Sequence, residues 1–130
     1  MKLKWIDRTL VIGSHYVALC TTEKLYKKAL KHLRIPKKDQ SDFLMKWHSN
    51  ATAHYFENRG NKSCSVVVCL GSTEGATTGQ VFGLLTHEAV HVWQQIKESI
   101  GEHSPSHEFE AYAIQNIAQG LFLEYERQTK

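Results

Sequence analysis

The sequence predicts a single small α+β domain. Its 130 residues are 42% hydrophobic and 22% charged, which is typical of one globular domain and not of a disordered chain or a fibre. A run rich in β-branched residues, residues 63–70, predicts a strand. Two longer segments after it, residues 78–98 and 106–126, have the apolar spacing of helices. We therefore expect one domain over residues 1–130, with a small β-sheet packed against two long helices.

Composition and patterning also exclude several classes of protein. No apolar run approaches the roughly 18 residues that a membrane-spanning helix needs, and the basic N-terminus lacks the apolar stretch of a secretory signal. The three cysteines include no Cys-x-x-Cys pair, so reduced thiols are expected and not a disulfide scaffold. The net charge of +3 does not by itself require a nucleic acid partner. We expect a cytoplasmic protein without a membrane partner.

The first half of the chain predicts short elements. Residues 5–20 mix β-branched and aromatic side chains around Gly13, which favours one or two short strands. Thr21 or Thr22 then begins a helix that ends near Leu33, before Pro36. Residues 41–47 predict a second, short helix.

A β-hairpin is expected next. Residues 51–57 have the pattern of a strand, and they precede the stronger strand at residues 63–70. Residues 58–61 between them form a turn, in which Gly60 is free to adopt a positive φ. This hairpin would supply most of the predicted sheet.

Residues 24–38 carry seven Lys and Arg side chains and no acidic one. Such a run is either a binding patch for nucleic acid or an acidic partner, or simply the solvated face of an amphipathic helix. No aromatic side chains are interleaved with the basic ones to suggest stacking on bases. We therefore expect a solvated face and no nucleic acid partner.

The strongest functional signal is the motif His87-Glu88-Ala89-Val90-His91 within the first long helix. Residues four apart in a helix lie about 40° apart around the axis, so two imidazoles at this spacing can bind one tetrahedral metal ion. Glu88 is placed to act on a water molecule at the metal without binding the metal itself. The flanking apolar stripe suggests that both histidines are partly buried. The motif therefore predicts a Zn²⁺ site, although the same ligand types also suit iron or manganese.

A catalytic zinc site needs a third protein ligand, and the candidates lie after the motif. Glu108 begins a polar stripe beside the core stripe of the last helix, whereas Glu110 extends the core stripe itself. Helix phase therefore favours Glu108 as the third ligand, with Glu110 and His107 as alternatives. His103 is a further candidate in the same stretch.

At this point the sequence resembles the gluzincin zinc metallopeptidases, in which a glutamate on a later helix follows the His-Glu-x-x-His motif. The phrase beginning at Glu108, Glu-Phe-Glu-Ala-Tyr, is similar to the Glu-x-x-Ala-Asp/Asn pattern of the ImmA/IrrE-type families. That resemblance also implies that Glu108 binds zinc, but Tyr112 replaces the Asp or Asn that would orient a ligand histidine. Small phage- and prophage-encoded metallopeptidases carry similar phrases, which implies a cytoplasmic setting in bacteria or infected hosts and a minimal zincin-like fold.

These residues predict a zinc-dependent hydrolase that acts on a peptide or protein. Glu88 would be the general base, and Tyr112 would either stabilise the oxyanion or hold a ligand histidine. The strand at residues 66–70 would align the substrate along its edge. Two other interpretations remain open. In the first, the domain is a binding or regulatory module with little catalysis. In the second, its zinc is structural.

Overall fold

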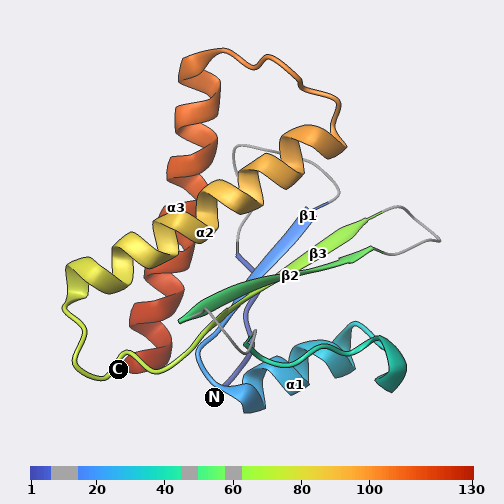
Figure 1. The fold of residues 1–130 in the computed structure, drawn as a ribbon, viewed down its shortest axis with the longest axis vertical. Helices are drawn as coiled ribbons and strands as arrows, with labels where there is room; N and C mark the ends of the chain where they lie inside the picture. Colours follow the sequence, from blue (N-terminus) through green and yellow to red (C-terminus); the bar gives the residue numbers. More distant parts are fainter. Residues whose placement is uncertain (7–14, 45–49, 58–62) are drawn as a thin grey trace.

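The computed structural model describes residues 1–6, 15–44, 50–57 and 63–130, and it confirms a small α+β domain. A three-stranded sheet lies between one helix on one face and two crossing helices on the other (Figure 1). None of these helices has the length and apolar character needed to cross a bilayer. The elements in chain order are β1 (His15–Cys20), α1 (Glu23–His32), a 3₁₀ turn (Lys37–Asp39), β2 (Ala51–Glu57), β3 (Cys64–Leu70), α2 (Thr78–Ser99) and α3 (His107–Thr129).

The central strand of the sheet is β3, and this corrects one expectation. β3 pairs with β2 in an antiparallel manner, which confirms the hairpin pairing, and with β1 in a parallel manner. Because β3 has a neighbour on both sides, residues 66–70 have no free edge to offer a substrate, and that prediction is wrong. In the described residues the two edge strands are β1 and β2. The outer side of β1 carries a bridge from Ala18 to Trp5, so β2 is the edge that we consider for an extended chain.

Alternation along β3 builds two hydrophobic cores. Val66 and Val68 pack with α2 and α3, whereas Val67 and Cys69 pack with α1. Cys64 belongs to the first core and Cys69 to the second, as their odd spacing predicts. Every residue of β3 is buried, Ser65 included, which explains why residues 66–70 form a continuous apolar run and not an alternating one.

The helix boundaries follow local capping signals. Thr22 caps α1 as predicted, and a reciprocal capping box between Thr77 and Gln80 begins α2. At the other end of α2, Gly101 adopts a φ of +75°. Its N–H donates to Glu98 and the next N–H donates to Lys97, which is the Schellman arrangement that ends a helix. α2 is therefore fixed at both ends by its own sequence.

The remaining local predictions have mixed outcomes. The helix predicted at 41–47 is wrong over 41–44, which are not helical, and residues 45–47 lie outside the described residues. Within residues 5–20 the structure has β1 and a single antiparallel bridge between Trp5 and Ala18. Gly13 and the predicted turn at 58–61 lie outside the described residues.

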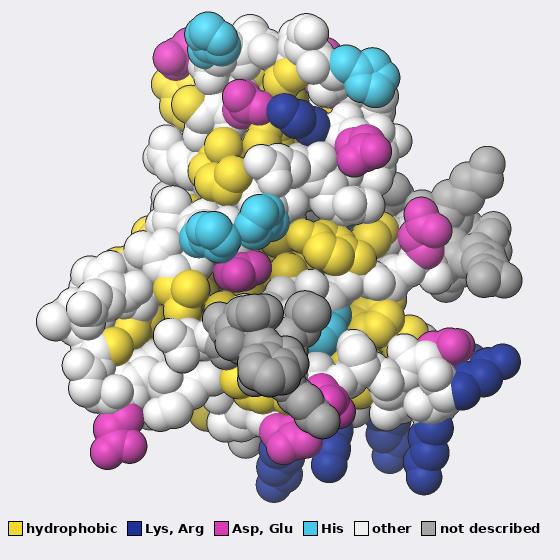
Figure 2. Space-filling view, viewed as in Figure 1, with side chains coloured by type: hydrophobic (Ala, Val, Ile, Leu, Met, Phe, Trp, Pro, Cys, Tyr) yellow, Lys and Arg dark blue, Asp and Glu magenta, His cyan; other side chains and the backbone are white. Residues whose placement is uncertain are grey.

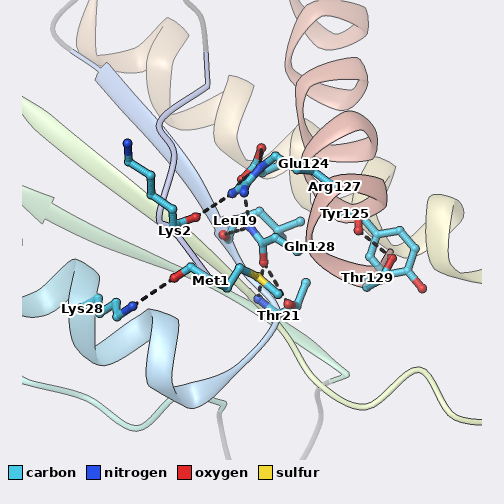
Figure 3. A network of polar contacts seen from close by, with 10 residues as sticks. All are labelled: Met1, Lys2, Leu19, Thr21, Lys28, Glu124, Tyr125, Arg127, Gln128 and Thr129. Carbon is cyan, nitrogen blue, oxygen red and sulfur yellow. Dashed lines mark hydrogen bonds and ion pairs between the residues drawn. The ribbon is translucent and has the colours of Figure 1, made fainter.

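A buried polar network ties the end of α3 to β1 and to the N-terminus (Figure 3). The Gln128 amide donates to the Leu19 carbonyl oxygen at 2.7 Å, and its oxygen accepts from the Thr21 N–H and hydroxyl at 3.1 and 2.8 Å. Glu124 accepts from Gln128 at 3.0 Å and pairs with Arg127. Arg127 in turn donates to a backbone carbonyl at the N-terminus. These contacts hold α3, and thus the helix pair, in place on the sheet.

Candidate functional site

The two histidines of the motif meet on the outer face of α2. Their Nε2 atoms are 3.1 Å apart, and Nδ1 of His91 lies 3.1 Å from the Gln94 side-chain oxygen. Nitrogens bound to one tetrahedral zinc at about 2.0–2.1 Å lie about 3.3 Å from each other. Figure 2 shows a pair of histidine side chains side by side, next to an acidic one. The spacing of His87 and His91 therefore fits two ligands of one zinc ion.

Burial within the motif differs from the expectation. His87 and His91 are both exposed and not partly buried, because the apolar stripe of α2 faces the sheet and α3. Glu88 is the buried member, with 7% of its surface exposed. Burial raises the pKa of the Glu88 carboxyl, and the charges of His87 and His91 act in the opposite direction. The structure thus places two accessible nitrogens beside a shielded carboxyl group.

Glu88 and His91 line a cleft of about 460 Å³ between α2 and the edge strand β2. This volume lies within the range of small-molecule and peptide side-chain sites. The wall formed by β2 includes Ala53 and Tyr55. The cleft therefore adjoins an edge strand of the sheet. Its complete lining is Ala51, Thr52, Ala53, Tyr55, Glu88, His91, Gln94, Gln95 and Glu98.

Tyr55 is the phenol that the fold brings to this cleft. It is 39% exposed, and burial together with the nearby charge of Glu88 raises its pKa to about 12. The hydroxyl therefore stays protonated at neutral pH and can donate a hydrogen bond. The sequence pattern does not single out Tyr55, since nothing in it shows which face of the helices β2 approaches.

Tyr112 and Glu108 lie elsewhere on the surface. Tyr112 is 56% exposed on α3, and Glu108 is an exposed residue in the first turn of that helix. Neither is among the described residues that line the cleft.

Glu110 has a structural partner. It accepts a hydrogen bond from the indole N–H of Trp93 at 2.8 Å and a charged one from Lys97 at 3.4 Å. Those donors hold the pKa of Glu110 below its ordinary value. Trp93 lies about 120° around α2 from His87 at 100° per residue. Glu110 therefore faces a different side of α2 from the histidine pair and links the two long helices.

The described ranges contain no cluster of three or more His, Cys, Asp or Glu side chains that could hold a metal ion. The structure accordingly brings together two of the three predicted ligands, His87 and His91, with Glu88 beside them. For Glu108, ligation stays a prediction.

The other histidines have separate environments. His54 faces the α1 side of the sheet, where its Nδ1 and Nε2 atoms lie 3.0 Å from the Ser41 hydroxyl and the Phe43 carbonyl oxygen. His103, in the loop before α3, and His107, the first residue of α3, are both exposed. His15 is buried, with no hydrogen-bond partner for either ring nitrogen among the described residues. Of these four, none lines the cleft.

No family model matches the chain, and comparisons with curated proteins and with solved structures also return no significant match. The functional argument therefore depends on the residues and their geometry.

Proposed function

We propose that this protein is a zinc-dependent hydrolase, most directly a peptidase. The observation that carries the proposal is the 3.1 Å approach of the His87 and His91 Nε2 atoms beside the buried carboxyl group of Glu88. Two imidazoles at the ligand spacing of zinc, with a carboxyl group one residue away, are the parts that hydrolysis with a metal requires.

Each side chain has a distinct task in this proposal. His87 and His91 would hold Zn²⁺, which supplies a water molecule that is acidic at neutral pH and polarises the substrate carbonyl. Glu88 accepts a proton from the attacking water and delivers it to the departing amine nitrogen. Its burial strengthens both transfers, because fewer solvent molecules compete for the carboxyl oxygens. Glu108 remains our proposed third ligand.

Substrate alignment is assigned to β2. An extended peptide can add to the outer side of this strand by backbone hydrogen bonds, and β2 forms one wall of the cleft that contains Glu88. Tyr55, on the same strand, is a protonated donor that can stabilise the negative charge developing on the carbonyl oxygen. The chemistry and the binding edge then share one cleft.

A purely structural zinc has less support. The interface between α2 and α3 is already joined by the hydrogen bond from Trp93 to Glu110 and by a shared core. His87 and His91 are exposed on α2 instead of lying in that interface. A metal at this pair would therefore not be needed to hold the two helices together.

Metal content tests the ligands directly. We expect about one zinc per wild-type chain, lost in His87→Ala and in His91→Ala because a site without one of its nitrogens binds zinc far more weakly. The measurement is elemental analysis after exposure to zinc and desalting, which also identifies iron or manganese if either is preferred.

Variants at other residues test whether the loss of zinc is specific to the proposed ligands. His103→Ala, an exposed histidine outside the cleft, should keep its metal. Glu108→Gln should lose it if Glu108 is the third ligand, whereas Glu110→Gln should keep the metal and lower stability. A wild-type protein that binds no metal when zinc is supplied would refute the proposed site.

Tyr55→Phe tests the oxyanion donor. We expect kcat for a cleaved peptide to fall about 10²-fold with little change in KM, because the phenol stabilises charge that develops in the transition state. The control is Tyr112→Phe, which removes the same hydroxyl from α3 and should leave kcat unchanged. If Tyr112→Phe lost activity and Tyr55→Phe did not, the assignment to β2 would be wrong.

A further inference from the structure

One face of α1 carries a concentrated positive charge. Lys24, Lys27, Lys28 and Lys31 are all exposed, and at 100° per residue they fall within an arc of about 100° around the helix. Three more exposed basic residues follow the end of the helix. Lys and Arg side chains gather at the lower edge of the molecule in Figure 2. We call these seven residues the basic face: Lys24, Lys27, Lys28, Lys31, Arg34, Lys37 and Lys38.

No ion pair among the described residues neutralises the positive charges of the basic face. In the described part of the chain, the ion pairs are Lys97 with Glu110 and Arg127 with Glu124, and neither involves the basic face. Lys28 donates to a neutral backbone carbonyl of Met1. Mutual repulsion among like charges destabilises the folded protein, so such a face favours an anionic partner that relieves it.

A groove of about 1270 Å³ begins where α1 ends. Arg34 and Lys38 of the basic face line it, and aromatic side chains from distant parts of the chain line it as well. The Trp5 ring lies 5.9 Å from the His32 ring, and Tyr16 of β1 is 40% exposed. Two carboxylates, Asp39 and Glu57, also line the groove, so its excess positive charge comes from the adjoining helix. The aromatic lining is Trp5, Tyr16, Tyr55 and Phe56.

The backbone is strained where α1 passes into the groove. Arg34 adopts a φ of +56°, a left-handed conformation that costs a non-glycine residue about 1 kcal/mol or more. Its N–H donates to the Lys31 carbonyl at 3.1 Å and the next N–H donates to Leu30 at 3.0 Å. This turn carries the chain from the lysine row directly into the groove wall, so the two surfaces are continuous.

We propose that the basic face and this groove bind single-stranded nucleic acid. Tyr55 lines both this groove and the cleft beside Glu88, but the lysines of the basic face lie outside that cleft. Lysine side chains contact phosphates in a sequence-independent way, and unpaired bases stack on the aromatic side chains of the groove. In a duplex the base faces are stacked on one another, so they are not available to stack on the aromatic side chains of the groove. An acidic polypeptide can neutralise the positive charge of the basic face, but it has no planar bases to stack on the aromatic side chains of the groove.

Fluorescence anisotropy with a labelled oligothymidylate of about 20 nucleotides tests the proposal. We expect binding at about 50 mM salt that weakens by 10-fold or more at about 200 mM, because each neutralised phosphate contributes about −0.7 to the log–log salt slope. The double variant Lys24→Gln with Lys31→Gln should bind about 10-fold more weakly. The control, Lys97→Gln with Lys130→Gln, removes the same charge elsewhere and should bind within about twofold of wild type.

Two further arms identify the partner. Tyr16→Ala, checked for folding by circular dichroism, should weaken binding of the oligothymidylate about 5-fold through lost stacking. Glu88→Gln should bind like wild type, which separates this surface from the peptidase proposal. Equal or tighter binding of a duplex or of polyglutamate of similar length would overturn the proposal, as would equal losses in the two lysine double variants.

Discussion

Replacing Glu88 by glutamine is expected to reduce peptide hydrolysis about 10²- to 10⁴-fold while zinc content stays at the wild-type level. Glutamine has nearly the same shape as glutamate, so the buried position should tolerate it. It cannot accept the proton of the attacking water at neutral pH, and the transfer to the leaving amine is lost with it. The measurement is turnover of a mixed peptide library by mass spectrometry, alongside elemental analysis of both proteins.

Glu98→Gln is the matched control for this experiment. Glu98 lines the same cleft but is exposed and lies nearly three turns further along α2. Its replacement removes one negative charge from the cleft and should change turnover by less than about threefold, since an exposed charge is screened by solvent. Full activity in Glu88→Gln would eliminate the mechanism. Absence of turnover in wild-type protein that does hold zinc would instead favour a binding or regulatory module.

The largest expected effect on stability comes from Gln128→Ala. The change removes the partners of the Leu19 carbonyl and the Thr21 N–H, both at the end of β1. A buried polar group left without a partner costs about 1–3 kcal/mol, so we expect the free energy of unfolding to fall by about 2–4 kcal/mol. Urea unfolding at neutral pH measures it. Gln119→Ala, an exposed residue on the same helix, should change the free energy by less than about 0.5 kcal/mol.

The same network predicts a pH dependence. Burial alone raises the pKa of Glu124, but hydrogen bonds from Arg127 and Gln128 outweigh it and hold the pKa below its ordinary value. A carboxyl group whose pKa is lowered by folding stabilises the protein above its ordinary pKa, and this stability is lost as pH falls through the lowered value. Gln128→Ala removes one of those hydrogen bonds, so the stability gap to wild type should narrow in acid. A gap that is constant with pH would show that the hydrogen bond from Gln128 to Glu124 does not contribute to stability.

Much of the local structure could be predicted because its causes are local. The Thr22 cap, the helical period of α2 and α3, and the pairing of β2 with β3 follow from neighbouring residues along the chain. The arrangement of His87, Glu88 and His91 could be predicted for the same reason, since all three belong to one helix whose geometry fixes their spacing. The helix expected at 41–47 failed over its first residues because no periodic apolar face supports it there.

Contacts between distant segments could not be predicted in the same way. The sequence shows two strands in a hairpin, but not that β1 adds to the far side of β3 and leaves β2 at the edge. For that reason the substrate edge was assigned to the wrong strand, and Tyr55 could not be ranked above Tyr112. Helix phase marked Glu110 as lying near the core, but only the crossing of α2 and α3 shows that Trp93 is its partner.

The basic face illustrates the same division. The sequence alone determined a lysine-rich helix, because charge and helical period are properties of one short segment. It also indicated a solvated surface, because no aromatic residue is interleaved within residues 24–38. What that segment alone could not show is that the tertiary structure brings Trp5 and Tyr16 to the groove at the end of α1. Periodicity determines which face a helix presents, whereas the order of strands in the sheet determines which side chains from elsewhere meet that face.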